Sequence, residues 1–244
     1  MEHSFYRTYF DLEKENWWFR VRRNLIFGLF KKYKIDNEKK ILDYGCGSGF
    51  LVGQLQDRGF DVYGVDMSED AINFGSSRGV NNLFRANGTR IKFPDEHFDV
   101  ILAMDVIEHI EDDSLAVSEL SRLLKPGGHL IITVPAYQWM WGVQDEVAHH
   151  FRRYTMGSFL KLVKSTSGLK VIRRTYFNTF LFLPAALVRI ASKAFKLKSR
   201  ESDFDINNNF LNKLLYTIFN LEVKLSSYIS YPFGVSILII LSKN

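Results

Sequence analysis

Residues 41–49 read ILDYGCGSG, an apolar run that ends in an acid, Asp43, followed by glycines at positions 45, 47 and 49. Glycine lets the backbone turn tightly and lets a ligand approach it closely, so such a loop is typical of nucleotide-type sites. The dinucleotide fingerprint G-x-G-x-x-G would need a glycine at position 50, which is Phe50. The spacing therefore disfavours a nicotinamide cofactor and an oxidoreductase, and indicates that the loop binds another kind of ligand.

Apolar runs of strand length alternate with helical segments through the first part of the chain. We predict strands at residues 39–44, 61–66, 81–86, 98–104 and 129–135, and a helix at 113–124 that ends before Lys125–Gly128. Strands joined by helices predict a parallel, doubly wound sheet, which binds ligands at the carboxyl ends of its strands. The glycine loop, Asp66 and residues 104–109 all follow strand ends, so we expect them to meet at one crevice.

The pattern changes after Pro135. We predict a helix at 155–166, a strand at 169–177, a helical segment at 178–230 and a last strand at 234–241. The expected organisation is an N-terminal helical segment covering the site (1–38), a core (39–177), a helical cap (178–230) and a final core strand (231–244).

Composition narrows the class of protein. The chain has 244 residues, 46% of them hydrophobic, which is enough for a sizeable core. A single cysteine, Cys46, excludes a disulfide framework and a multi-cysteine metal centre, and we expect no metal site. Residues 1–10 carry charge and no apolar core, and no window reaches about 18 uninterrupted apolar residues, so we expect a cytoplasmic protein.

Charge is divided unevenly along the chain. Residues 149–244 contain 15 Lys or Arg against 4 Asp or Glu, a net +11, whereas residues 1–148 contain 17 against 23, a net −6. A basic half favours an anionic substrate or a membrane surface, although a solvated basic surface has the same composition. Nucleic acid is disfavoured because the basic residues do not follow a recognised RNA module.

An acid follows the second predicted strand at Asp66, 21 residues after Gly45. At this position of a nucleotide-binding sheet, a carboxylate accepts hydrogen bonds from the ribose hydroxyls. The pairing of Asp66 with the glycine loop is more specific than the glycines alone.

Several stretches in order now carry a resemblance. ILDYGCGSG, GVDMS (64–68), IKFPDEHFDVILAMDVIEHI (91–110) and ELSRLLKPGGHLIITVP (119–135) resemble the motifs of class I S-adenosylmethionine-dependent methyltransferases. WWFRVRR (17–23) and DEVAHHFRRY (145–154) are similar to a subgroup of that family. The resemblance implies a Rossmann-like, seven-stranded α/β sheet with the last strand antiparallel.

The resemblance also implies a cofactor, S-adenosyl-L-methionine, with S-adenosyl-L-homocysteine as product, and roles for particular residues. Asp43, Gly45, Cys46 and Gly47 would face the methionine part, while Asp66 would bind the ribose beside Met67. The other expected cofactor residues are Asn87, Gly88, Met104, Asp105 and His109. Asn87 stands where the family usually has an acid, and its amide can still accept from the adenine amino group.

The segment after the fifth strand supplies the candidates for chemistry. His150 would be a general base and Tyr154 an orienting group, because imidazole titrates near neutral pH. Arg152 and Arg153 would grip an anionic group of the substrate, and Trp18 would line its pocket. A structural alternative stays open, in which this segment holds a lid and Asp145 pairs with an arginine.

The sequence therefore predicts a methyltransferase that acts on a small or lipid-linked acceptor, with peripheral membrane contact through the basic half. Two other hypotheses remain at this stage. One is a non-catalytic cofactor-binding or scaffold module with the same fold. The other is a nucleotide-dependent oxidoreductase, which the glycine spacing disfavours.

Overall fold

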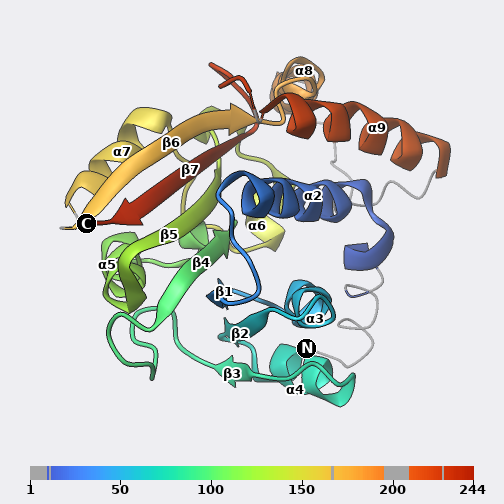
Figure 1. Ribbon diagram of the computed structural model, residues 1–244. Coiled ribbons are helices and arrows are strands. Elements are labelled where there is room, and N and C mark those ends of the chain that lie inside the picture. The colour runs from blue at the N-terminus through green and yellow to red at the C-terminus, as the bar shows by residue number, and fades with distance from the viewer. Residues whose placement is uncertain (1–9, 11, 166–167, 195–208, 227) are drawn as a thin grey trace.

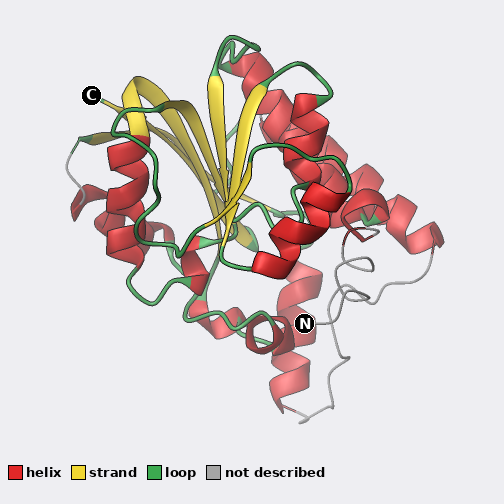
Figure 2. Cartoon of the chain, turned by 90° about the horizontal axis from the view of Figure 1, so that it is seen from below, coloured by secondary structure: helices red, strands yellow, loops and turns green. Residues whose placement is uncertain are grey.

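The chain forms one mixed sheet with helices on both faces (Figures 1 and 2). A computed structural model describes residue 10 and residues 12–165, 168–194, 209–226 and 228–244. Within these residues the strand order is β3-β2-β1-β4-β5-β7-β6. The first five strands are parallel, and β7 runs antiparallel to both of its neighbours. The predicted doubly wound, seven-stranded sheet with an antiparallel last strand is confirmed.

The elements follow the predicted order. The strands are β1 (Lys40–Tyr44), β2 (Asp61–Asp66), β3 (Leu83–Arg85), β4 (Phe98–Met104), β5 (Leu124–Pro135), β6 (Leu169–Phe177) and β7 (Ser236–Lys243). The helices are α2 (Trp17–Lys32), α3 (Phe50–Gln56), α4 (Glu69–Ser77), α5 (Asp113–Leu123), α6 (Val143–Val147), α7 (Met156–Ser165), α8 (Phe182–Ala194) and α9 (Asn209–Ser226), with single 3-10 turns η1 (Ile107–His109) and η2 (Gln138–Met140).

Most predicted strand and helix boundaries lie within two residues of the observed ones, but the start of one strand differs by five. Lys125–Gly128 was expected to separate a helix from a strand that begins at residue 129, but β5 begins at Leu124, directly after α5. Leu124 pairs with Phe98 across a register shift in β4, and Gly127 has a φ of +75°. The irregular pairing allows the glycines to lie within the strand. Helix-stop residues alone do not predict this, because the pairing depends on the neighbouring strand.

Two hydrophobic clusters fill the two faces of the sheet. On one face, Leu120 of α5 and Phe159 of α7 are fully buried against the strands. On the other face, Leu25 of α2, Val52 of α3 and Phe219 of α9 pack together. The sheet is therefore covered on both sides, and only its strand ends are free to form a site.

The first and last helical regions share one layer. Helices α2 and α9 lie side by side (Figure 1), and the Trp17 amide donates to Asn212 Oδ1 at 2.8 Å. Buried Glu222 of α9 accepts hydrogen bonds from the amides of Thr179 and Phe180, just before α8. Residues 195–208 of the predicted cap, and all of residues 1–10 except Phe10, lie outside the described part.

None of the described helices is both long enough and apolar enough to cross a membrane.

Candidate active site

A cavity of about 430 Å³ opens at the carboxyl ends of β1, β2 and β4. This volume falls within the range of small-molecule sites. β1 has β2 on one side and β4 on the other, so the cavity lies at the topological switch point of the sheet. The crevice predicted from the strand ends is therefore present.

The glycine loop forms one wall, and one of its glycines is sterically required. Gly45 has a φ of +79°, and a Cβ added there would lie 2.3 Å from Val106 Cγ2. The amides of Gly45 and Cys46 both donate to the Val65 carbonyl, at 2.8 and 3.0 Å. These bonds fix the loop against the end of β2 and hold it open towards the cavity.

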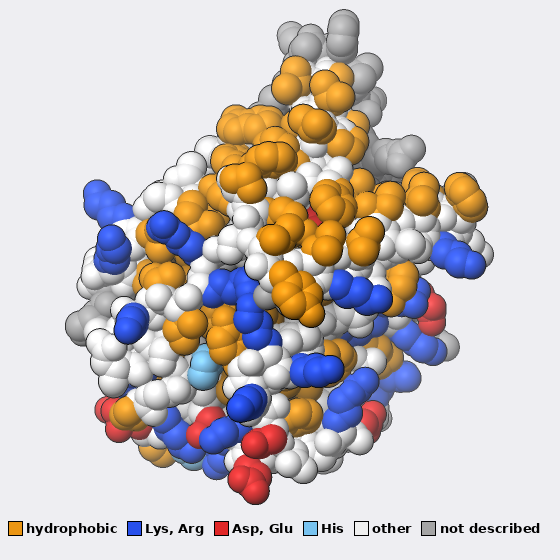
Figure 3. Space-filling model, turned by 45° about the horizontal axis from the view of Figure 1, so that its top comes forward, with side chains coloured by type: hydrophobic (Ala, Val, Ile, Leu, Met, Phe, Trp, Pro, Cys, Tyr) orange, Lys and Arg blue, Asp and Glu red, His pale blue; other side chains and the backbone are white. Residues whose placement is uncertain are grey.

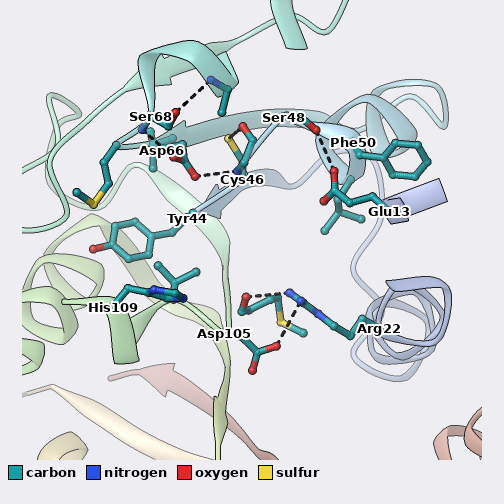
Figure 4. A pocket seen from close by; sticks show the side chains of 18 of the residues that line it. Glu13, Arg22, Tyr44, Cys46, Ser48, Phe50, Asp66, Ser68, Asp105 and His109 are labelled. Atoms are coloured by element: carbon teal, nitrogen blue, oxygen red, sulfur yellow. Dashed lines mark hydrogen bonds and ion pairs between the residues drawn. The ribbon is translucent and has the colours of Figure 1, made fainter. Parts of the chain in front are cut away.

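Asp66 stands at the end of β2 and faces the same loop (Figure 4). Its Oδ2 accepts from the Gly47 amide at 2.8 Å, and its Oδ1 accepts from the Ser68 amide at 2.9 Å. A carboxylate has about four lone-pair sites, so two remain for a ligand's hydroxyl groups. The two backbone hydrogen bonds thus orient the Asp66 carboxylate and leave acceptor sites for a ligand.

Two carboxyl groups near the loop have strongly shifted pKa values. Burial raises the pKa of Asp43 to about 7, against an opposing effect of Arg22. Burial likewise raises the pKa of Glu13 to about 7, although Ser48 Oγ donates to Glu13 Oε2 at 2.9 Å. A cationic ligand beside these groups would favour their charged forms.

Helix α2 closes the cavity from the other side with an arginine. Arg22 Nη1 lies 3.3 Å from Asp105 Oδ2, and Arg22 Nη2 donates to the Met104 carbonyl at 2.8 Å. Figure 4 shows Arg22 and Asp105 pointing towards each other at one side of the cavity. The N-terminal helix is thereby tied to the end of β4, where Asp105 itself has a φ of +56°.

His109 of η1 also lines the cavity and contacts a second histidine outside it. Its ring lies edge-on to the ring of His150, with 4.5 Å between centroids. Burial, with a further contribution from His150, lowers the pKa of His109. His109 is therefore the histidine that a bound ligand would meet first.

The segment 145–154 forms a buried polar network behind these rings. His150 Nδ1 lies 2.9 Å from Asp145 Oδ1, and Arg153 Nε donates to the same oxygen at 2.7 Å. Burial opposes ionisation of Asp145, but the bonds from His150 and Arg153 outweigh it and hold its pKa well below the usual range. The pairing of Asp145 with an arginine is what the structural alternative expected.

None of the five residues predicted for catalysis or substrate binding lines the cavity: His150 and Arg153 belong to the network around Asp145, and the other three make contacts elsewhere. Tyr154 is buried, and its hydroxyl donates to Asp113 Oδ2 at 2.8 Å. Arg152 Nη1 lies 2.9 Å from the same carboxylate oxygen. Trp18 stacks on Phe177 with 5.9 Å between ring centroids. Their proposed parts in catalysis and substrate binding stay predictions, and their contacts here are structural.

Most predicted cofactor residues do converge. Nine of the eleven line the cavity: Gly45, Cys46, Gly47, Asp66, Met67, Gly88, Met104, Asp105 and His109. Asp43 is buried beneath the loop, and Asn87 lines a separate hollow with Arg90 and Lys92. The expected contact of Asn87 with adenine therefore stays a prediction without support from the cavity.

Sequence reasoning missed several lining residues, among them Glu13, Arg22, Arg23, Tyr44 and Ser68. The signal for two of them was present, since Arg22 and Arg23 end the WWFRVRR stretch. Glu13 carried no signal, because it precedes every recognised motif.

Comparison with solved structures places the fold. The chain aligns with a putative sarcosine dimethylglycine methyltransferase from Galdieria sulphuraria at a TM-score of 0.61, with 17% identity, covering 92% of this chain and 86% of that one. It aligns with a phosphoethanolamine N-methyltransferase 2 from Haemonchus contortus, in complex with S-adenosyl-L-methionine, at a TM-score of 0.59 and 16% identity. That alignment covers 90% of this chain and 52% of the other. A [4+2]-cyclase aligns at a TM-score of 0.59 and 17% identity, covering 91% of this chain and 80% of that one.

Comparison of sequences gives the class. Residues 42–132 match a family described as "Methyltransferase domain". The chain is 31% identical over 151 residues to a ubiquinone biosynthesis O-methyltransferase from Bartonella bacilliformis, covering 54% of this chain and 60% of that protein. A protein of the same name from Thiobacillus denitrificans is 30% identical over 164 residues, covering 64% and 63%. The chain thus spans about three fifths of the length of these curated relatives.

Residues 42–132 thus match a methyltransferase domain, and the fold of the chain is similar to that of the solved methyltransferases above. S-adenosylmethionine is the cofactor that the resemblance predicts for this cavity. The residues of the cavity fit that molecule, because Asp66 has acceptor sites left for ribose hydroxyls and the raised pKa values of Asp43 and Glu13 suit a ligand with cationic groups.

Proposed function

We propose that this chain transfers a methyl group from S-adenosylmethionine to an oxygen atom of a small-molecule acceptor. The convergence of nine predicted cofactor residues on one cavity carries the proposal. The choice of oxygen rests on the relatives that are named O-methyltransferases.

The cofactor, when bound, supplies an electrophilic methyl group, so the protein mainly orients the acceptor and excludes water. Asp66 would hold the ribose, and the Arg22–Asp105 pair would set the wall beside the transferred methyl. The acceptor would enter beside His109, the histidine that lines the cavity. His150 as a general base stays a prediction: Asp145 holds its Nδ1, which leaves Nε2 as the basic nitrogen.

Turnover with an isotopically labelled cofactor tests this function. The purified chain would be incubated with trideuteromethyl-labelled S-adenosylmethionine and fractionated small-molecule extracts, and labelled products would be found by mass spectrometry. We expect a labelled methyl ether, and none with Asp66→Ala. Tight cofactor binding without any labelled product would favour the non-catalytic alternative.

We also propose that the acceptor is lipid-linked and that the chain meets it at an anionic membrane surface. The contact would be the α8–α9 face, defined by the exposed side chains Leu183, Leu187, Val188, Ile190, Phe210 and Tyr228. Leu187 is 67% exposed and Phe210 is 76% exposed. Figure 3 shows hydrophobic side chains gathered on this side of the molecule with Lys and Arg beside them.

The charges near this face suit anionic lipid headgroups. Lys213 and Lys224 of α9 are exposed. Within described residues 149–194 and 209–244, the only acidic side chain is Glu222, which is buried. An apolar face with a basic surround is the pattern of interfacial helices, and no exposed carboxylate in these ranges would repel the lipids.

Vesicle co-sedimentation tests the membrane contact. We expect binding to vesicles that contain phosphatidylserine, weaker binding to pure phosphatidylcholine, and a loss of binding as salt exceeds about 0.1 M, because exposed charges are then screened. The double substitution of Leu187 and Phe210 by Ser should weaken binding, whereas Leu115→Ser, an exposed apolar position on α5, should not. Equal binding by both variants would contradict the α8–α9 face.

A further inference from the structure

Three side chains with metal-ligand chemistry meet beside the cavity. The ligand atoms of Glu108, His109 and His150 lie within 4.8 Å of one another. Glu108 and His109 are consecutive in η1, whereas His150 comes from the segment after α6. The fold, rather than local sequence, therefore brings these groups together.

Glu108 has no visible partner for its carboxyl group. The residue is fully buried, and among the described residues neither carboxyl oxygen has a hydrogen-bond partner. The nearby cations are already engaged, since Arg22 pairs with Asp105 and Arg153 pairs with Asp145. A buried carboxylate left unpaired is costly, so a cation bound at the cluster would remove a defect of the folded state.

Each imidazole has a hydrogen bond on one ring nitrogen, as metal-binding histidines usually do. Asp145 Oδ1 lies 2.9 Å from His150 Nδ1, which leaves Nε2 of that ring. The backbone of Ala148 hydrogen-bonds the ring of His109, and an imidazole has a second nitrogen. A hydrogen bond on one ring nitrogen fixes the orientation of the other towards a metal.

We propose that Glu108, His109 and His150 bind a divalent transition-metal ion on the acceptor side of the cavity. Two histidines and one carboxylate are a ligand set for Zn²⁺ or Fe²⁺, with positions left open for a substrate oxygen. Tetrahedral ligands about 2.1 Å from an ion lie about 3.4 Å apart, so a separation of 4.8 Å must contract by about 1 Å or slightly more on binding. His109 and His150 are only partly buried, which leaves their rings room to move.

The role of the ion in chemistry rests on the proposed function. A cation contacting the acceptor's hydroxyl would lower the pKa of that hydroxyl, so that its proton passes to water. The freed oxygen would form the new O–CH₃ bond as the S–CH₃ bond breaks, and the sulfonium would leave as a neutral thioether. In this scheme the cation takes the place of His150 as general base.

Cobalt titration of the purified, chelator-treated chain tests the site directly. We expect one equivalent of Co²⁺ to bind with visible absorption bands, and Zn²⁺ to displace it. Glu108→Gln keeps the shape but removes the charge, and His150→Ala removes a ligand, so each should weaken binding by at least about tenfold. His149→Asn, at an exposed neighbouring histidine, should bind like the unaltered chain.

Absence of Co²⁺ and Zn²⁺ binding by the unaltered chain, or equal binding by Glu108→Gln, would overturn the proposal. S-adenosylhomocysteine affinity measured on the same samples separates this result from the proposed function. Glu108→Gln should retain that affinity. A chain that binds S-adenosylhomocysteine but no metal would lose only the metal site, whereas one that binds metal but no cofactor would lose the proposed methyl transfer.

Discussion

Arg22 of α2 and Asp105 at the end of β4 form an ion pair in the wall of the candidate cofactor cavity, with 3.3 Å between Nη1 and Oδ2. Both side chains are about four-fifths buried, at 19% exposure each. Arg22 also donates to the Met104 carbonyl at 2.8 Å. One side chain therefore links the N-terminal helix to the strand that carries the wall of the cavity.

Arg22→Ala should lower the free energy of unfolding by about 1–3 kcal/mol, because a charge-assisted hydrogen bond is lost and Asp105 is left without its partner. Urea unfolding measures the change. Lys31→Ala, an exposed position on the same helix, is the matched control and should be neutral. Equal stability of the unaltered chain and Arg22→Ala would mean that the pair does not hold α2 in place.

Asp66→Ala should abolish most S-adenosylhomocysteine binding. Two charge-assisted hydrogen bonds to the ribose, at about 1.5–3 kcal/mol each, would be lost. Calorimetry measures the dissociation constant. Asp61→Ala, at the opposite end of β2, is the control and should bind normally. An unchanged affinity in Asp66→Ala would remove Asp66 from the cofactor site.

Asp43 should make the ligand-free chain less stable as pH rises. Its carboxyl group has a pKa of about 7 when folded, raised by burial above an ordinary value of 3.8. Between about pH 4 and pH 7 the unfolded chain has lost this proton while the folded chain retains it, so unfolding becomes more favourable by an amount on the order of a few kcal/mol. Glu13, also with a pKa of about 7, acts in the same direction.

Comparison with Asp43→Asn isolates this contribution, since asparagine keeps the shape and cannot ionise. Urea midpoints at about pH 5 and about pH 8 should fall less in Asp43→Asn than in the unaltered chain. Glu38→Gln, at an exposed position, should retain the full fall. Identical pH dependence in all three proteins would show that Asp43 ionises normally when folded.

Arg153→Ala should reduce stability rather than acceptor binding. Arg153 and Asp145 form a buried pair, with side chains 7% and 1% exposed, and removing one partner of such a pair costs about 3–5 kcal/mol. Arg152→Ala should cost about 1 kcal/mol or less, because that side chain is 28% exposed. A large rise in the acceptor KM with unchanged thermal stability in Arg153→Ala would instead favour the anion-gripping role expected from the sequence.

The contacts of α2 show that packing decides which residues of this helix enter the cavity. WWFRVRR indicated a functional segment, yet it singled out Trp18 and not Arg22. Trp18 packs on Phe177 away from the cavity, while Arg22 enters it. The sequence pattern of a helix does not distinguish a residue that faces the core from one that faces a ligand. Only the position of α2 on the sheet shows which of its residues enters the cavity.

The sequence by itself determined the sheet, the glycine loop and the position of Asp66. Apolar runs and strand-end acids are local patterns, and parallel pairing then forces the carboxyl ends of β1, β2 and β4 to one edge. Only the tertiary structure decided that Glu13 and Arg22 reach this edge, that Arg153 turns inward to Asp145, and that Glu108 meets two histidines. These contacts join residues far apart in the chain, and their geometry depends on how helices and loops pack, which no local pattern records.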